Sequence, residues 1–99
     1  MPTLTLPQLV AGRKLAADAV DRLGSISGDD VLVDARPLVS GTASFAGQLV
    51  RSVVLDGGAA RLTVIGGPSN FLDDARAAAT QLGVADRLVF VEATADLAS

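Results

Sequence analysis

Three hydroxyl side chains alternate along one short stretch of the chain, at Ser40, Thr42 and Ser44. They follow an apolar run that ends in Asp34, and they precede an apolar, helix-like segment that starts at Phe45. A hydroxyl oxygen at the start of a helix accepts a hydrogen bond from an unpaired backbone N–H, and such a cap contributes about 1 kcal/mol. The same place tolerates a phosphate group, because the added negative charge meets the positive end of the helix dipole. The stretch is therefore either a helix cap or a surface at which one of these hydroxyls is phosphorylated.

A second candidate for binding chemistry is the run of residues 66 to 70, "GGPSN". Two glycines ahead of a helix can hold a phosphate through backbone N–H groups. The run contains no lysine, and it matches neither the dinucleotide-binding pattern nor the P-loop pattern. Its simplest interpretation is a tight strand-to-helix turn. The alternative is an anion site made of Gly66, Gly67, Ser69 and Asn70.

The composition excludes most catalytic and metal-binding schemes. The 99 residues include no histidine and no cysteine, which removes imidazole acid–base chemistry, thiolate nucleophiles and disulfides. Asp73 and Asp74 fall in the first turn of an expected helix, where the helix dipole accounts for them. Lys14 is the only lysine, and a serine–lysine dyad would need it to reach the hydroxyl stretch. We therefore expect no enzymatic activity, no cofactor and no metal ion.

The charge pattern argues against nucleic acid and membrane as partners. The net charge is −3, and the eight basic residues are scattered, with Arg13 and Lys14 the only adjacent pair. A nucleic-acid-binding surface needs a basic patch or stripe. The chain also has no signal-peptide pattern and no apolar run of about 18 residues, the length that spans a membrane. These features favour a cytoplasmic protein.

The order of expected elements predicts an α/β domain. Apolar runs bounded by turn residues indicate strands, and apolar residues at helical spacing indicate helices between them. The order β-α-β-α-β-α-β predicts about four strands in a mostly parallel or mixed sheet, with three helices and right-handed crossovers. The chain, 1–99, is expected to form a single domain. The expected strands are 4–6, 31–35, 61–67 and 87–93, and the expected helices are 9–23, 45–55 and 68–83, the last capped by Ser69 or Asn70.

The stretch 31–50, "VLVDARPLVSGTASFAGQLV", resembles the core motif of STAS domains, the sulphate-transporter and anti-sigma-factor-antagonist family. In that motif an apolar strand ends in an aspartate, here Asp34, and Asp-Ser-Ser-Gly opens a helix about eight to ten residues later. The chain looks closer to the STAS-like branch, whose helix opens with Ser-Phe-Ala, as at residues 44–46. The first helix of that branch follows a Gly-Arg pair, as at residues 12–13. The resemblance covers residues 9–92.

The resemblance implies a small α/β sandwich with a mixed sheet and a regulatory role. It implies that the domain binds a kinase-type anti-sigma factor or a similar regulator, and that serine phosphorylation switches this binding. By position, Ser44 matches the second serine of the motif, Ala43 stands at the usual phosphoacceptor, and Thr42 stands at the aspartate. The usual phosphorylation chemistry therefore does not carry over intact, and Ser44 or Thr42 would have to substitute. Partner binding without phosphorylation is the alternative.

We therefore predict a non-enzymatic regulatory domain of the STAS-like type that docks a protein partner. The docking surface is expected over residues 36–48, and its predicted members are Asp34, Arg36, Phe45 and Gln48 with the hydroxyls of Ser40, Thr42 and Ser44. Two alternatives stay open. One is a small phosphate- or nucleotide-binding domain that uses the helix N-termini at Ser69 and Ser44. The other is a structural homodimer subunit that pairs through the helix face of Val50, Val53 and Val54.

Overall fold

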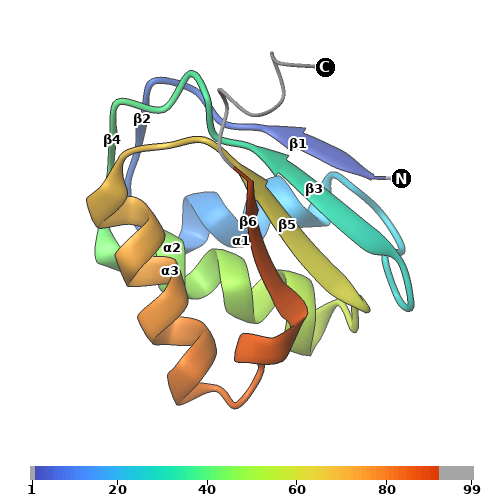
Figure 1. Cartoon of the computed structure of the whole chain (residues 1–99). Helices are drawn as coiled ribbons and strands as arrows, with labels where there is room; N and C mark the ends of the chain where they lie inside the picture. Colours follow the sequence, from blue (N-terminus) through green and yellow to red (C-terminus); the bar gives the residue numbers. More distant parts are fainter. Residues whose placement is uncertain (1, 92–99) are drawn as a thin grey trace, which may run out of the picture.

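The structure, a computed structural model, describes residues 2 to 91 of the chain and contains one parallel sheet of four strands in the order β1-β3-β5-β6 (Figure 1). All three pairings within this sheet are parallel. The predicted α/β class and order of elements are confirmed, and the sheet is parallel rather than mixed throughout the described residues. The strands are β1 (Thr3–Thr5), β3 (Asp30–Asp34), β5 (Arg61–Ile65) and β6 (Leu88–Val91).

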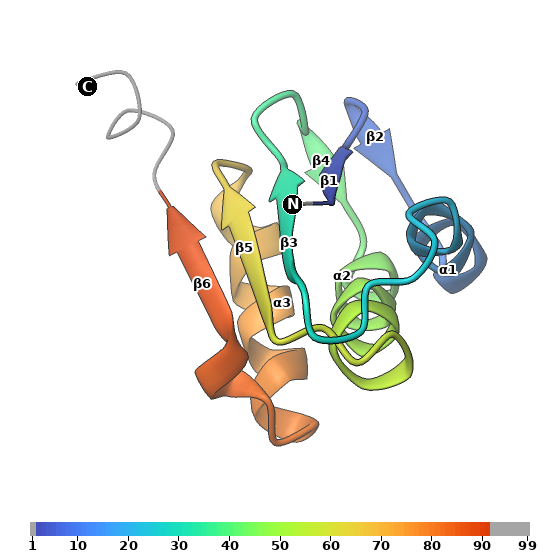
Figure 2. The ribbon, with the colours of Figure 1, turned by 90° about the vertical axis from the view of Figure 1, so that its right-hand side faces the viewer.

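Three helices lie together on one face of this sheet, as the two views at right angles show (Figures 1 and 2). The physical reason is the strand order, because each new strand is added on the same side of the previous one. Right-handed crossovers made in one constant direction all pass over the same face. The other face carries no helix from the part of the chain that the structure describes. The helices are α1 (Arg13–Asp21), α2 (Ala43–Val50) and α3 (Ser69–Gln81), with a π-helix η1 (Arg51–Asp56) continuing α2 and a 3-10 turn η2 (Ala85–Arg87) leading into β6.

The hydrophobic core fills the space between the sheet and the helices. Val31 and Val33 of β3 are fully buried on the helix side, while the intervening Leu32 is only half-buried. This alternation is the period-two pattern of a strand whose two faces meet different surroundings. From the helix layer, Phe45 of α2 and Phe71 of α3 meet with their ring centroids 6.3 Å apart.

A second, two-stranded parallel sheet joins β2 (Leu9–Val10) and β4 (Ser40–Gly41) beside the main sheet. The sequence predicted a helix from residue 9, and this boundary is wrong. Gly12 adopts a φ of 86°, a left-handed conformation that glycine adopts readily and that ends the extended segment before α1 begins. Each of these strands is only two residues long, too short to show a periodic pattern.

The helix face expected to form a homodimer is in fact core. Val50 and Val53 are 0% exposed and Val54 is 2% exposed. The wider π-helical turn explains how neighbouring residues are buried together, since the Gly57 N–H donates to the Ser52 carbonyl at 2.8 Å and shifts the register of the helix face. These valines are therefore not available to a second chain.

Candidate functional site

The hydroxyl stretch forms the connection from β4 into α2, next to β2 (Figure 1). We call the exposed part of this region the β4–α2 surface. Its members are Leu9, Val39, Ser40, Thr42 and Ser44, all of them exposed. The backbone of the stretch is held in place because the Val39 and Ser40 N–H groups both donate to the Gln8 carbonyl, at 2.8 and 3.1 Å.

Thr42 is the cap of α2, which confirms one of the two predicted roles for the hydroxyls. Its Oγ1 accepts a hydrogen bond from the Phe45 N–H at 3.2 Å and a second one from the Gly12 N–H at 3.3 Å. One oxygen therefore joins the start of α2 to the start of α1. A hydroxyl oxygen has two acceptor positions, and these two hydrogen bonds occupy both of them.

Ser40 and Ser44 differ from Thr42 because their side chains make no hydrogen bond with any other residue in the described range 2–91. Ser44 lies in the first turn of α2 and faces a groove of about 550 Å³ between α2 and α3. Two arginines, Arg13 and Arg51, line the same groove, together with Asp74. Both serine hydroxyls are accessible to another molecule.

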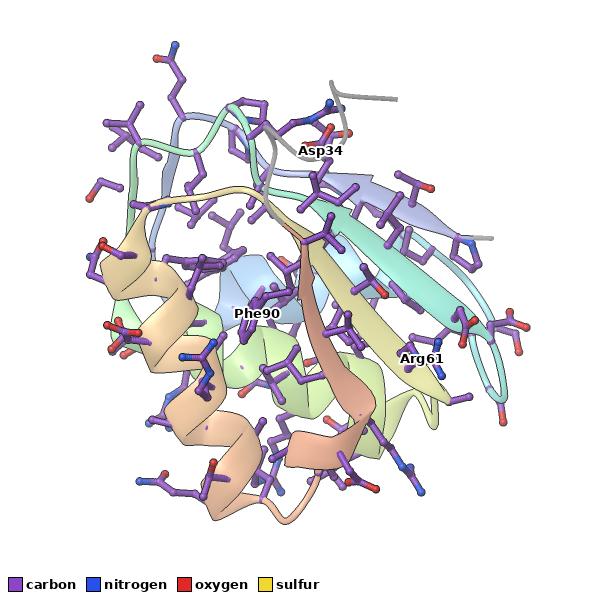
Figure 3. The ribbon with its side chains drawn as sticks, in the orientation of Figure 1. Asp34, Arg61 and Phe90 are labelled. Atoms are coloured by element: carbon purple, nitrogen blue, oxygen red, sulfur yellow. The ribbon has the colours of Figure 1, made fainter. Side chains whose placement is uncertain are left out.

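Asp34 and Arg36, predicted as part of the docking surface, are bonded to each other. The Arg36 Nε donates to Asp34 Oδ1 at 2.9 Å and its second guanidinium nitrogen donates to Oδ2 at 2.8 Å. The Arg36 backbone N–H also donates to Oδ1, at 3.1 Å. The side-chain hydrogen bonds from Arg36 lower the pKa of the Asp34 carboxyl. This bidentate pair fixes the turn that follows β3 (the end at which Figure 3 labels Asp34).

Phe45 does not belong to a docking surface, and this prediction is corrected. Its side chain is 1% exposed and packs against Phe71, because α2 turns this residue toward the core. Gln48 is half-buried, and its Nε2 donates to the Ser52 hydroxyl at 2.8 Å. Within residues 36–48, the accessible side chains are therefore those before and at the start of α2.

Sequence reasoning missed the two most exposed large apolar side chains, Leu9 at 70% and Val39 at 68% exposed. They lie on segments that are bonded together, since Leu9 is in β2 and Val39 directly precedes β4. The sequence assigns Leu9 to a helix, and Val39 lies within the predicted docking surface of residues 36–48 without being named as one of its members. Leu9 is the register partner of Ser40, and Val39 is the residue before Ser40, so two exposed aliphatic residues adjoin this hydroxyl.

The predicted alternative anion site is a tight turn in which one backbone N–H group is already hydrogen-bonded within the chain. Gly66 and Gly67 have φ values of 66° and 99°, and the Gly66 N–H donates to the Val91 carbonyl at 2.9 Å. Helix α3 starts after Pro68 without a side-chain cap, so the cap expected at Ser69 or Asn70 is wrong. None of these residues lines the groove at Ser44 or the second cavity, of about 490 Å³, between α1 and η1.

Comparison with protein-family models, with curated proteins and with solved structures found no match for this chain. Within residues 2–91, none of the helices has the length and apolar character needed to cross a membrane. Over the same range, no group of three or more His, Cys, Asp or Glu side chains is arranged to hold a metal ion. Any assignment of function therefore depends on the residues and geometry of this chain.

Proposed function

We propose that the protein is a non-enzymatic regulatory domain that docks a protein partner on the β4–α2 surface. The observation that carries this proposal is that Ser40 adjoins two exposed aliphatic residues, its register partner Leu9 and its chain neighbour Val39. The hydroxyls of Ser40 and Ser44 are exposed and make no hydrogen bond within residues 2–91. Protein interfaces combine a few apolar anchors with a polar rim. In keeping with the resemblance to STAS-like domains, the partner is a kinase-type anti-sigma factor or a similar regulator.

Ser44 is the hydroxyl at which phosphorylation would switch docking. It is exposed and lies in the first turn of α2, where a phosphate meets the positive end of the helix dipole. Arg13 and Arg51 line the same groove and offer positive charge nearby. Thr42 is the less suitable phosphorylation site because its hydroxyl oxygen already accepts two hydrogen bonds from backbone N–H groups.

The test is affinity capture with the tagged chain and three matched variants. Val39→Glu replaces one of the two aliphatic residues beside Ser40 with a charge and should abolish capture of any specific partner. Leu15→Glu, at a side chain of α1 that is 44% exposed, is the control and should leave capture unchanged. Ser44→Asp should change the captured amount while the unfolding curve stays nearly that of the original chain.

Two results would count against docking on this surface. One is capture that is equal for the original chain and for Val39→Glu. The other is a Ser44→Asp variant that is unfolded, which would make Ser44 a structural residue.

A small-anion function is the second candidate, and the groove beside Ser44 is the observation that favours it. Its volume of about 550 Å³ lies within the range of ligand sites, and Arg13 and Arg51 line it. A bound ligand stabilises the folded state by mass action. A rise in melting temperature with phosphate or a nucleotide, lost in Arg51→Ala, would support this function.

A further inference from the structure

The face of the main sheet that the helices leave uncovered is made of alternate residues of its four strands. The pairing register sets these residues in rows across the sheet, with Leu32 beside Thr63 and Asp34 beside Ile65. We call this surface the open face. Its members are Thr3 and Thr5 of β1, Asp30, Leu32 and Asp34 of β3, Arg61, Thr63 and Ile65 of β5, and Val89 and Val91 of β6.

The open face carries four aliphatic residues, although no helix among the described residues covers it. Parallel sheets occur almost only with both faces covered. Leu32, Ile65 and Val91 are half-buried, and Val89 is 37% exposed. On β6, Phe90 points to the helix side, where the Arg76 guanidinium lies 4.9 Å from its ring centroid. Val89 and Val91 therefore belong to the other face.

Two opposite charges stand side by side at the amino end of the open face. Asp30 of β3 and Arg61 of β5 are register partners, and both are exposed (Figure 3 labels Arg61). Neither makes an ion pair with another residue in the range 2–91. At the carboxyl end, Asp34 is already bonded to Arg36. Within residues 2–91, the amino end thus presents one unpaired negative charge and one unpaired positive charge on adjacent strands.

We propose that a second copy of this chain covers the open face. The two copies are related by a twofold axis that lies above this face, parallel to the strands and midway between β3 and β5. Such an axis places β3 of one copy over β5 of the other without a shift along the strands. Because Asp30 and Arg61 share one register position, each lies opposite its counter-charge in the second copy. The same operation sets Leu32 opposite Thr63. The two charges at the amino end are therefore self-complementary, as a twofold interface requires.

The open face is small for an interface between two chains. Four strands about 4.8 Å apart and up to five residues long give a face of roughly 20 by 15 Å. This is smaller than the patch of about 800 Å² per partner that specific interfaces usually bury. The expected dimer is accordingly weak and depends on concentration.

Sedimentation of the full chain, from about 10 μM to about 1 mM, tests the proposal with two charge reversals. The original chain should shift from monomer to dimer over this range. Asp30→Arg alone opposes two arginines to two arginines, and Arg61→Asp alone opposes two aspartates to two aspartates. Each single variant should weaken self-association by about tenfold or more, because like charges then face each other. An equimolar mixture of the two variants should form a heterodimer, and the double variant should recover the homodimer.

Two control variants separate this interface from other surfaces. Arg22→Asp makes the same change of charge after α1, on the helix side, and should leave dimerisation unchanged. Ser44→Asp should do the same, so that failure of the dimer and failure of docking on the β4–α2 surface are measured independently. A chain that stays monomeric at about 1 mM would overturn the proposal. So would a dimer that is indifferent to both reversals, or single variants that fail to associate when mixed although each is folded by circular dichroism.

Discussion

The two faces of the main sheet are built from neighbouring residues of the same strands, yet they meet different surroundings. Val33 and Leu62, on the helix side, are fully buried, whereas Leu32 and Thr63, on the open face, are half-buried. A one-sided sheet normally alternates between apolar and polar residues. Here the alternation is incomplete, because Leu32, Ile65 and Val89 continue the apolar character on the open face. Burial in this chain is therefore decided by topology, because the crossovers place all three helices on one face of the sheet.

The largest expected effect comes from truncating one leucine on the covered face. Leu62 is 0% exposed, so Leu62→Ala should lower the free energy of unfolding by about 2–5 kcal/mol through lost burial and a residual cavity. Ile65→Ala, on the same strand but on the open face, should cost clearly less in the monomer. Urea denaturation at low micromolar protein concentration compares the two. Equal losses would mean that the open face is as well packed as the helix side.

Two glycines outside the main sheet, Gly41 in β4 and Gly47 in α2, differ in how closely they are packed. A Cβ at Gly41 would lie 2.8 Å from the Phe71 ring and 3.1 Å from Val10, and Phe71 is fully buried. We expect Gly41→Ala to destabilise the fold by about 1–3 kcal/mol through overpacking. A Cβ at Gly47 would meet only Ala78, at 3.8 Å. Gly47→Ala should therefore be neutral or stabilise α2 by up to about 1 kcal/mol, as thermal unfolding would show.

The sequence predicts the covered side well because local patterns and core packing agree there. The strand of residues 31–35 was found as β3, and the helix of residues 68–83 was found as α3, within two residues at each end. The helix is long enough to show its period, the strand is a continuous apolar run, and turn residues flank both. The order of elements then leads to a parallel sheet through the preference for right-handed crossovers.

The sequence could not predict the pairing of the shortest strands or which side chains near the candidate site are buried. β2 and β4 have two residues each, so their pairing depends on contacts that no local pattern encodes. Phe45 and Val39 illustrate the consequence at the candidate site, since they lie close in sequence but are 1% and 68% exposed. The tertiary position of α2 makes that difference. For the same reason, only the hydrogen bonds in the structure distinguish the capping hydroxyl of Thr42 from those of Ser40 and Ser44.

A smaller effect separates two hydroxyls of the β4–α2 surface. Thr42→Ala removes an acceptor for the Phe45 and Gly12 N–H groups and should cost about 1 kcal/mol or somewhat more. Ser44→Ala removes no hydrogen bond within the described residues and should stay within about 0.5 kcal/mol. Hydrogen exchange should quicken at the amides of Phe45 and Gly12 in the first variant only. Faster exchange at these amides in Ser44→Ala would assign a capping role to Ser44 as well.

The smallest effect concerns pH and the carboxyl end of the open face. Hydrogen bonds from Arg36 lower the pKa of Asp34 in the folded protein, whereas an unfolded aspartate has a pKa of about 3.9. The pair therefore stabilises the fold above about pH 4, and this contribution is lost as the pH falls through the lower, folded pKa. In Asp34→Asn the free energy of unfolding should be reduced at neutral pH and should approach that of the original chain in acid. Asp29→Asn, at an exposed residue that forms no ion pair in the described range, is the matched control for urea denaturation across this pH range. A constant difference between the original chain and Asp34→Asn at every pH would show that Asp34 acts through the shape of the turn rather than through its charge.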